Sequence, residues 1–243
     1  MIDKLHKNYH SKDGMVVAID DITLDIKDGE YVSIVGPSGC GKSTLLNIIG
    51  GIDTKSGGKI IMDEDIKIGY MLQNDCLFPW LNILDNCLLG LKIKGNLNDE
   101  NINYVKDLLN TYGLGEFIYK YPSSLSGGMK QRVALIRTLA LKPDILLLDE
   151  PFSALDYQTR LAVSDDVYNI IKDTGKTVIM ITHDIAEAIS MSDRVIVLTN
   201  RPAKVKNIYN IELENKSNPI NNRKCKEFSM YYDMIWKEID YHV

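Results

Sequence analysis

The stretch GPSGCGKST at residues 36–44 constrains the fold of this chain more than any other part of the sequence. It matches the phosphate-loop pattern G-x-x-x-x-G-K-[ST], and it lies between an apolar run typical of a strand and an apolar segment typical of a helix. In such a loop the glycines turn backbone N–H groups toward phosphate oxygens, and the N-terminus of the following helix adds positive potential. The residues expected to bind phosphate are Gly36, Pro37, Ser38, Gly39, Cys40, Gly41, Lys42, Ser43 and Thr44.

A pair of carboxylates in the segment DILLLDEP complements this loop. Asp149 and Glu150 follow the apolar run 145–148, and ligands of open α/β sheets bind where strands end. We expect Lys42 to reach the terminal phosphates of a nucleotide, and Ser43 and Asp149 to hold Mg²⁺. Glu150 is then expected to polarise the attacking water, because phosphoryl transfer depends on a positioned nucleophile.

Short apolar runs rich in Val and Ile recur along the chain, as in strands that are buried on both faces of a parallel sheet. Longer segments with helical spacing lie between them, such as the one that carries Met129, Val133 and Ile136 on one face. The pattern predicts an α/β fold with a mainly parallel sheet, the core of a P-loop NTPase. The expected strands are residues 31–35, 68–72, 145–148, 178–182 and 195–198.

Two regions depart from this alternation. Residues 16–26 carry an Asp20-Asp21 pair between alternating apolar residues, which predicts a small antiparallel hairpin beside the main sheet. Residues 74–124 have helical character and predict an inserted helical subdomain. The short segment MDEDIKIGYML, residues 62–72, leaves room for only a short second hairpin.

A polar link beyond residue 215 precedes an apolar series spaced three and four residues apart, which predicts an amphipathic terminal helix. We expect this helix to dock on its own domain, with binding to a partner as the alternative. The chain is therefore interpreted as one domain, residues 1–243, with three parts. These are a nucleotide-binding core with the β subdomain (1–73 and 142–214), a helical subdomain (74–141), and a terminal link and helix (215–243).

Composition narrows the class of protein further. The 243 residues include 28 basic and 33 acidic side chains, and this formal net charge of −5 disfavours broad binding to nucleic acid. No apolar stretch approaches the roughly 18–20 residues that cross a bilayer, and the polar N-terminus does not resemble a secretory signal. The four cysteines are scattered without a Cys-x-x-Cys pair, which favours a reducing cytosol over a zinc site or a disulfide framework.

The run LSGGMKQR at residues 125–132 lies between the two nucleotide motifs. Ser126 is a plausible N-cap of an amphipathic helix, and Gly127 and Gly128 allow close approach to its backbone. Taken alone, Ser-Gly-Gly is an ordinary helix start. Since one nucleotide has a single triphosphate, which Lys42 already serves, a second anion site is best explained if it serves the ATP of another subunit.

Taken together, GPSGCGKST, Gln73, LSGGMKQR, DILLLDEP, SALD at 153–156 and His183 in ITHD resemble the motif set of the ATP-binding cassette (ABC) ATPases. The resemblance implies that Gln73 contacts Mg²⁺ and the attacking water, and that His183 contacts the γ-phosphate. It also implies that Asp156 lies across a subunit boundary. Tyr9 stands where the family places an aromatic that stacks on adenine, and packing on the small sheet is the alternative.

Two segments, FPWL after the glutamine and NRP at residues 200–202, resemble the nitrate, sulfonate and taurine branch of bacterial importers. In that branch the region after the glutamine docks on the cytoplasmic coupling helix of a permease. An apolar surface with aromatic anchors suits such an interface, and packing inside the helical subdomain is the alternative. The surface consists of Phe78, Pro79, Trp80 and Leu81.

The resemblance therefore implies an ATP-hydrolysing subunit of a bacterial ABC importer. Two chains would close head to tail over two ATP molecules with Mg²⁺, on the cytoplasmic face of the membrane, against an integral permease. An extracytoplasmic solute-binding protein would deliver the solute. The alternatives are an ABC exporter or lipoprotein-release ATPase, which shares these motifs, and a soluble cassette protein of DNA repair or translation.

Cys40 carries a separate expectation. It lies within the phosphate loop near Lys42 and a helix N-terminus, and both features favour a thiolate. We therefore expect thiol reagents to inactivate the protein and ATP to protect it.

Overall fold

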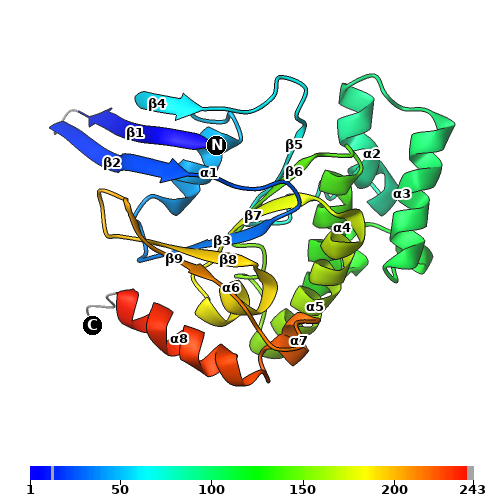
Figure 1. Cartoon of the computed structure of the whole chain (residues 1–243). Coiled ribbons are helices and arrows are strands. Elements are labelled where there is room, and N and C mark those ends of the chain that lie inside the picture. The colour runs from blue at the N-terminus through cyan, green and yellow to red at the C-terminus, as the bar shows by residue number, and fades with distance from the viewer. Residues whose placement is uncertain (12–13, 240–243) are drawn as a thin grey trace.

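The computed structural model describes residues 1–11 and 14–239 and places a six-stranded sheet at the centre of the molecule (Figure 1). Four neighbouring pairs are parallel, and the last strand is antiparallel. The predicted α/β fold with a mainly parallel sheet is confirmed, and each expected strand is present to within one residue at either end. In sheet order the strands are β5 (Ile68–Met71), β6 (Ile145–Asp149), β7 (Thr177–Ile181), β3 (Tyr31–Val35), β8 (Arg194–Leu198) and β9 (Val205–Asn210).

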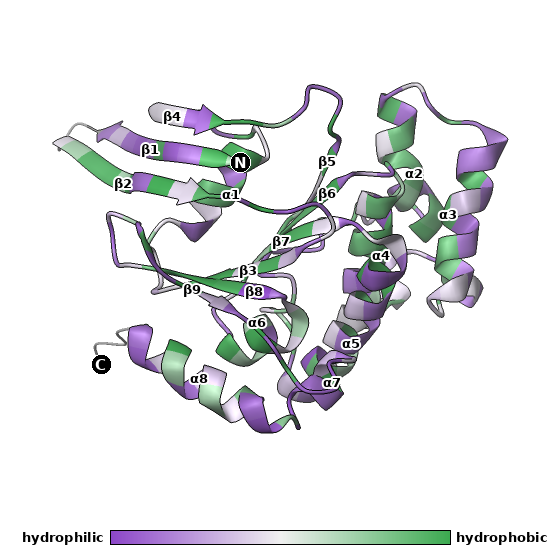
Figure 2. Cartoon of the chain, in the orientation of Figure 1, coloured by the Kyte–Doolittle hydropathy of each residue, from purple (hydrophilic) through white to green (hydrophobic). Residues whose placement is uncertain are grey.

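The apolar runs form strands at the centre of this sheet because both of its faces are covered. Every residue of β3 and of β7 is buried. One face packs against α1 (Lys42–Ile49) and the small sheet, and the other packs against α4 (Gly127–Leu139), α5 (Tyr157–Thr174) and α6 (Ile185–Met191). Figure 2 shows hydrophobic colour concentrated along the central strands.

A three-stranded antiparallel sheet, with the order β2-β1-β4, forms the predicted β subdomain. Its strands are β1 (Ile2–Ser11), β2 (Gly14–Leu24) and β4 (Gly57–Ile60). The hairpin expected within residues 16–26 is wrong, because the Asp20-Asp21 pair lies inside β2. Asp21 has φ 59°, and the register passes from Leu5↔Ile22 to Lys7↔Ile19, so the acidic pair marks a β-bulge with one extra residue.

The second hairpin expected around residues 62–72 does not form either. β4 pairs with β1 in the small sheet, whereas β5 pairs with β6 at the edge of the main sheet. The intervening residues form a turn, with the Ile66 N–H donating to the Asp63 carbonyl, that carries the chain from one sheet to the other. Two adjacent strands can therefore belong to different layers, which their sequence spacing does not reveal.

The inserted helical region lies beside the β5 edge of the main sheet (Figure 1). It contains α2 (Ile83–Ile93), α3 (Asp99–Thr111), the short 3₁₀ turns Gly115–Phe117 and Pro122–Ser124, and α4. A core of its own holds these elements together, and Val133 and Ile136 of α4 belong to it, as the spacing predicts. The opposite side of α4 packs on the main sheet through Ala134 and Leu135, so this helix joins the two parts. The subdomain limits at residues 74–141 stay a prediction.

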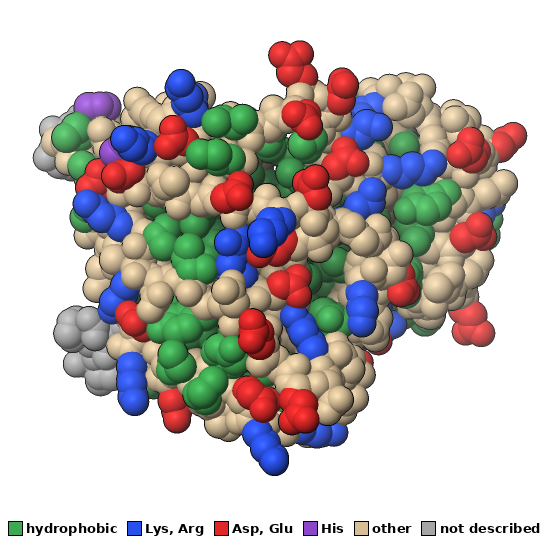
Figure 3. Space-filling model, in the orientation of Figure 1, with side chains coloured by type: hydrophobic (Ala, Val, Ile, Leu, Met, Phe, Trp, Pro, Cys, Tyr) green, Lys and Arg blue, Asp and Glu red, His purple; other side chains and the backbone are tan. Residues whose placement is uncertain are grey.

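The terminal helix α8 (Lys226–Glu238) docks on its own domain. Ile235 is fully buried against α6 and the β8–β9 side of the sheet, as expected for a helix that docks on its own domain. A short helix, α7 (Pro219–Asn222), precedes it and is not apparent in the polar sequence of the link. Among the described helices, none is both long and apolar enough to span a membrane. Acidic and basic side chains are both scattered over the visible face of the molecule (Figure 3).

Candidate nucleotide-hydrolysis site

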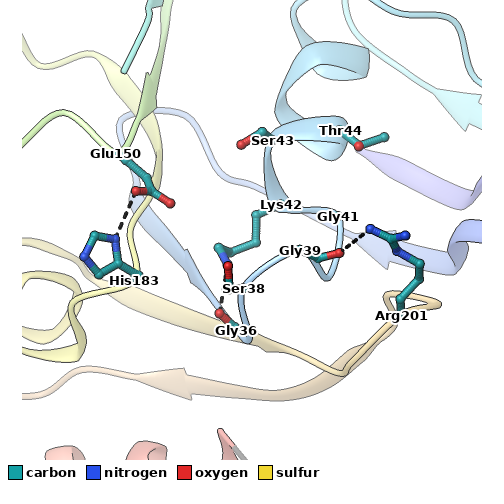
Figure 4. A pocket seen from close by; sticks show the side chains of 10 residues that line it. All are labelled: Gly36, Ser38, Gly39, Gly41, Lys42, Ser43, Thr44, Glu150, His183 and Arg201. Carbon is teal, nitrogen blue, oxygen red and sulfur yellow. Dashed lines mark hydrogen bonds and ion pairs between the residues drawn. The ribbon is translucent and has the colours of Figure 1, made fainter. Parts of the chain in front are cut away.

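A cavity of about 480 Å³ lies where β3, β6, β7 and β8 end. Each of these parallel strands is followed by at least one lining residue, because parallel strands deliver their carboxyl ends to one edge of the sheet. Figure 4 shows the phosphate loop crossing the cavity, with acidic and imidazole groups to one side. The lining residues are Gly36, Ser38, Gly39, Gly41, Lys42, Ser43, Thr44, Glu150, His183 and Arg201.

The phosphate loop encloses its own lysine. The Lys42 ammonium donates to the carbonyl oxygens of Gly36 at 2.8 Å and Pro37 at 2.9 Å. Gly41 has φ 124°, and a Cβ there would lie 3.1 Å from the Ala18 carbonyl oxygen, so the loop can curve this tightly only with glycine. The loop therefore forms a compact cradle of backbone groups at the start of α1, as its sequence predicts.

Cys40 is not the reactive thiolate that its position suggests. Its side chain is 2% exposed and belongs to the core beneath the small sheet. Burial raises the pKa of the thiol, and this effect outweighs the nearby Lys42 charge, which lowers it. The structure therefore contradicts the premise of the thiolate expectation, because the loop turns the sulfur inward while its backbone faces the cavity.

Asp149 lies behind the phosphate loop in contact with the first turn of α1. The Ser43 hydroxyl donates to its Oδ1 at 3.1 Å, and the Tyr70 hydroxyl approaches its Oδ2 at 3.5 Å. Burial, and then the charge of Glu150, raise the pKa of Asp149, while the Ser43 hydrogen bond lowers it. A carboxylate that is partly desolvated and has a hydroxyl beside it is the donor set from which Mg²⁺ takes one or two protein ligands, with water and phosphate oxygens completing its shell.

Glu150 is the point where three separate motifs meet. Its Oε2 lies 3.0 Å from His183 Nδ1, and it accepts a hydrogen bond of 3.4 Å from Gln73 Nε2. Gln73 Nε2 also donates to the Ser153 hydroxyl at 3.3 Å. Glu150 has φ 43°, a rare backbone conformation outside glycine that ends strand β6 abruptly at the cavity.

The residues predicted for a second phosphate site, and Asp156, which was predicted to lie across a subunit boundary, lie elsewhere. Ser126, Gly127 and Asp156 are exposed and do not line this cavity. Ser126 Oγ accepts from the Met129 N–H at 3.3 Å at the start of α4, and Asp156 caps α5 in the same way. Gly128 is buried, and a Cβ there would lie 2.6 Å from Val163 Cγ2. The structure therefore separates the predicted residues into two groups, those that line the cavity and those at the starts of α4 and α5.

Tyr9 also stands apart from the lining residues. It is 42% exposed on β1, its hydroxyl donates to Asp53 Oδ2 at 2.7 Å, and the Lys7 ammonium lies 4.6 Å from its ring centroid. The ring belongs to the small sheet but remains open to solvent. Its stacking on adenine stays a prediction.

Two features of the site lie outside the catalytic motifs, and no role in the site was predicted for them. The first is Arg201, which lines the cavity and donates from Nη2 to the Gly39 carbonyl at 2.7 Å. The signal that could have indicated this role is a cation three residues after β8, the strand beside β3.

The second feature is a buried carboxylate behind His183. Glu187 is 3% exposed and accepts from the Thr182 hydroxyl at 2.7 Å. Burial and the Asp184 charge raise its pKa to about 7, against lowering by Thr182 and two arginines. One of these, Arg160, donates to the Leu155 carbonyl at 3.0 Å and to Asp184 Oδ2 at 3.5 Å. Together, Arg160, Glu187 and their partners therefore link the segment before Asp156 to Thr182 and Asp184, the two neighbours of His183.

Comparison with known families agrees with this geometry. A family described as ABC transporter matches residues 19–153. The chain belongs to the ABC transporter family. It is an ATPase that uses ATP with Mg²⁺, and the predicted P-loop core is the fold of this family.

Relatives of this ABC ATPase extend over nearly its whole length. It is 43% identical to the uncharacterized ABC transporter ATP-binding protein YtlC of Bacillus subtilis, over 98% of this chain and 95% of the relative. It is 39% identical to the nitrate import ATP-binding protein NrtD of Synechocystis, over 96% and 92%. With the taurine import ATP-binding protein TauB of Roseobacter denitrificans it shares 41% identity, over 81% and 75%.

Solved structures resemble it as well. The dimeric structure of MJ0796, described as a bacterial ABC transporter cassette, superposes with a TM-score of 0.74 at 34% identity, over 87% of this chain and 98% of that one. A dimeric structure of the same cassette in a post-hydrolysis state, bound to ADP and Pi, gives a TM-score of 0.72 with the same coverage.

Proposed function

We propose that this ABC ATPase powers a bacterial importer of the nitrate, sulfonate and taurine class, acting from the cytoplasmic face of the membrane. Similarity to NrtD and TauB over most of the chain supports the class of importer. The observation that carries the catalytic proposal is the convergence of Gln73 and His183 on one oxygen of Glu150.

Phosphate binding is assigned to the loop and its lysine. The carbonyl oxygens of Gly36 and Pro37 hold the Lys42 ammonium at the cavity wall. Phosphate oxygens offer the same ammonium stronger, charge-assisted hydrogen bonds. Backbone N–H groups of residues 38–44 then complete the cradle at the N-terminus of α1.

The hydrolytic step is assigned to the acidic end of the cavity. Ser43 and Asp149 would hold Mg²⁺, with Gln73 beside them, and the ion neutralises charge on the phosphates when bound. The Glu150 carboxylate accepts a hydrogen bond from the attacking water and orients it in line with the γ-phosphate. His183 donates to the γ-phosphate, and its present contact with Glu150 keeps the imidazole at that end of the cavity.

The second phosphate site is assigned to a partner subunit. Ser126, Gly127 and Asp156 are exposed at helix starts and lie outside the cavity of their own chain. In a two-fold dimer the same surface of each chain faces the cavity of the other. The dimeric arrangement of the MJ0796 cassette supports this assignment. Tyr9 would stack on the adenine of its own chain.

The permease contact is assigned to residues 78–81. Trp80 is 69% exposed, and its ring centroid lies 5.2 Å from that of Phe78. The fully buried Asn86 fixes this loop, since it accepts from the Phe78 N–H at 2.7 Å and donates to the carbonyls of Phe78 and Leu81. An aromatic pair held outward on a rigid loop has the character of an interface anchor.

Exposed aromatic anchors can be tested by recovery from membranes. In cells that express the whole transporter, we expect Trp80→Ala to lose co-purification with the permease, while the isolated chain hydrolyses ATP as before. Ile93→Ala is a matched control, because Ile93 lies in the same subdomain and is 77% exposed. Equal recovery of both variants would contradict the proposed contact.

The class of solute needs a second measurement, because the ATPase does not touch the solute. A solute-binding protein that travels with the complex is expected to bind nitrate, taurine or an alkanesulfonate. A complex without any binding protein would favour the exporter alternative.

A further inference from the structure

Arg201 occupies the nucleotide cavity although it belongs to none of the catalytic motifs. It lies in the loop between β8 and β9, and its exposed guanidinium reaches over the phosphate loop to the Gly39 carbonyl (Figure 4). A cation that lines a phosphate-binding cavity needs an explanation beyond general solubility. Since guanidinium groups carry five N–H donors in a planar fork, one bond to a carbonyl leaves most of them available.

The loop that carries Arg201 is held firmly on two sides. The Thr199 hydroxyl accepts from the Lys204 N–H at 3.0 Å and so closes the loop on itself. Ala203 is bonded to β2 through two backbone hydrogen bonds, from its N–H to the Ala18 carbonyl at 2.9 Å and from the Asp20 N–H to its own carbonyl at 3.0 Å. The backbone next to Arg201 is therefore tied to the small sheet.

The cavity has two distinct ends. Figure 4 shows Glu150 and His183 at one end, Lys42 between, and Gly39 with Arg201 at the other. If Glu150 orients the water that attacks the γ-phosphate, the rest of the nucleotide extends from Lys42 away from Glu150. The α-phosphate and ribose then lie on the Arg201 side of the loop.

We propose that Arg201 binds the nucleotide at its α-phosphate end, as a contact supplied by the β8–β9 loop. This inference rests on the proposed function, since the position of Glu150 sets the direction of the nucleotide. Across the described part of the chain, the guanidinium makes only the bond to Gly39, and the side chain lines the cavity, so its remaining donors are available to a ligand there. A guanidinium–phosphate contact combines charge with directed hydrogen bonds.

The test compares ATP and ADP binding to the full-length chain by titration calorimetry with Mg²⁺ present. For Arg201→Met we expect the Kd of both nucleotides to rise by the same factor of about 5–20, because they share the α-phosphate. The KM for ATP in hydrolysis should rise together with the Kd, since the proposed contact acts on binding. Arg201→Lys should restore part of the affinity.

Lys204→Met is the matched control. Lys204 is an exposed cation of the same loop, but its ammonium lies 2.8 Å from Asp20 Oδ2 and it does not line the cavity. We expect this variant to bind both nucleotides within about twofold of the unchanged chain. A similar loss in both variants would overturn the proposal, because general positive charge would then explain the affinity.

Three other results would also overturn it. One is unchanged Kd values in Arg201→Met, and another is weakened binding of ATP with unchanged binding of ADP, which would place the group at the γ-phosphate. The third is a lowered melting temperature of Arg201→Met without nucleotide, with no recovery in Arg201→Lys. That result would mean that Arg201 only supports the phosphate loop through its bond to Gly39. Glu150→Gln is assayed in parallel to separate the Arg201 contact from the catalytic role proposed for Glu150. Because ADP affinity does not depend on hydrolysis, the Arg201 contact can fail while the role of Glu150 holds, and the reverse.

Discussion

The two groups of predicted nucleotide residues differ in how the chain presents them. Lys42, Glu150 and His183 come from segments far apart in sequence and meet in one cavity. Ser126 and Asp156 each cap a helix on the outside of that cavity. Lys42, Glu150 and His183 thus form an assembled group, which the fold of a single chain brings together. Ser126 and Asp156 form a displayed group, which is exposed on the surface outside the cavity.

The two groups are presented differently because different parts of the fold carry them, the main sheet and the starts of α4 and α5. Three parallel strands, β3, β6 and β7, deliver the first group to one edge of a sheet whose central strands β3 and β7 are buried. Ser126 belongs to the start of α4, and most of the helical subdomain around it has a separate core. The exposed start of α4 can contact another molecule without a change in the main sheet. We therefore expect that a complete site needs two chains.

The largest expected effect concerns the assembled group. Glu150→Gln should lower ATP hydrolysis by about 10²–10⁴-fold, because the amide no longer orients the water as the carboxylate does. ATP affinity should remain, and the variant should accumulate as a dimer in ATP, measured by size-exclusion chromatography with light scattering. Glu64→Gln, at an exposed position in the β4–β5 connection, is the control. Normal turnover in Glu150→Gln would remove the catalytic assignment.

The next prediction tests whether the displayed group serves a second chain. Lys42→Ala and Ser126→Arg are each expected to be inactive alone. Mixed in equal amounts, they should recover about a quarter of the unchanged activity, since half of the dimers would contain one intact site of two. The readout is the ATPase rate after the chains have exchanged partners.

A second mixture provides the control for this experiment. Lys42→Ala and Glu150→Gln both damage the assembled group, so every site in their mixed dimers carries one of the two changes. That mixture should stay inactive. If both mixtures recover alike, the two groups do not belong to different chains.

A smaller effect concerns the contact that joins the two groups. Glu187, with a pKa of about 7 against an ordinary value of 4.5, keeps a proton in the folded chain that the unfolded chain has lost. The unfolding free energy should therefore fall as pH rises from about 4.5 to 7, by about 1–2 kcal/mol between pH 5.5 and 8. Glu187→Gln should lack this slope in urea unfolding at the two pH values. An unchanged slope in the variant would assign the pH dependence to other groups.

The smallest effect concerns Cys40. Because its sulfur is buried, we expect the fast phase of thiol labelling to come from the exposed Cys76 and to disappear in Cys76→Ser. Cys40→Ser should label like the unchanged chain and bind ATP with nearly the same affinity. An ATP-protected fast phase that survives Cys76→Ser but is lost in Cys40→Ser would restore the thiolate hypothesis.

Much of the fold was predictable from short-range patterns. The strands of the main sheet follow from apolar runs, and the face of α4 follows from helical spacing, because both periods repeat within a few residues. The hairpin at Asp20-Asp21 was predicted wrongly because an acidic pair suits a bulge as well as a turn, and only the pairing partner distinguishes them.

The sequence by itself determined the chemistry of this protein: a phosphate loop, an acidic pair at a strand end, and a second helix start in a fixed order. The tertiary structure alone decided which of these groups meet. Gln73 and His183 reach Glu150, Arg201 joins the cavity, and Cys40 turns away from it. The reason is physical, since such contacts depend on the order of strands in the sheet, which brings together residues from 33 to 162 positions apart and leaves no local periodicity in the chain.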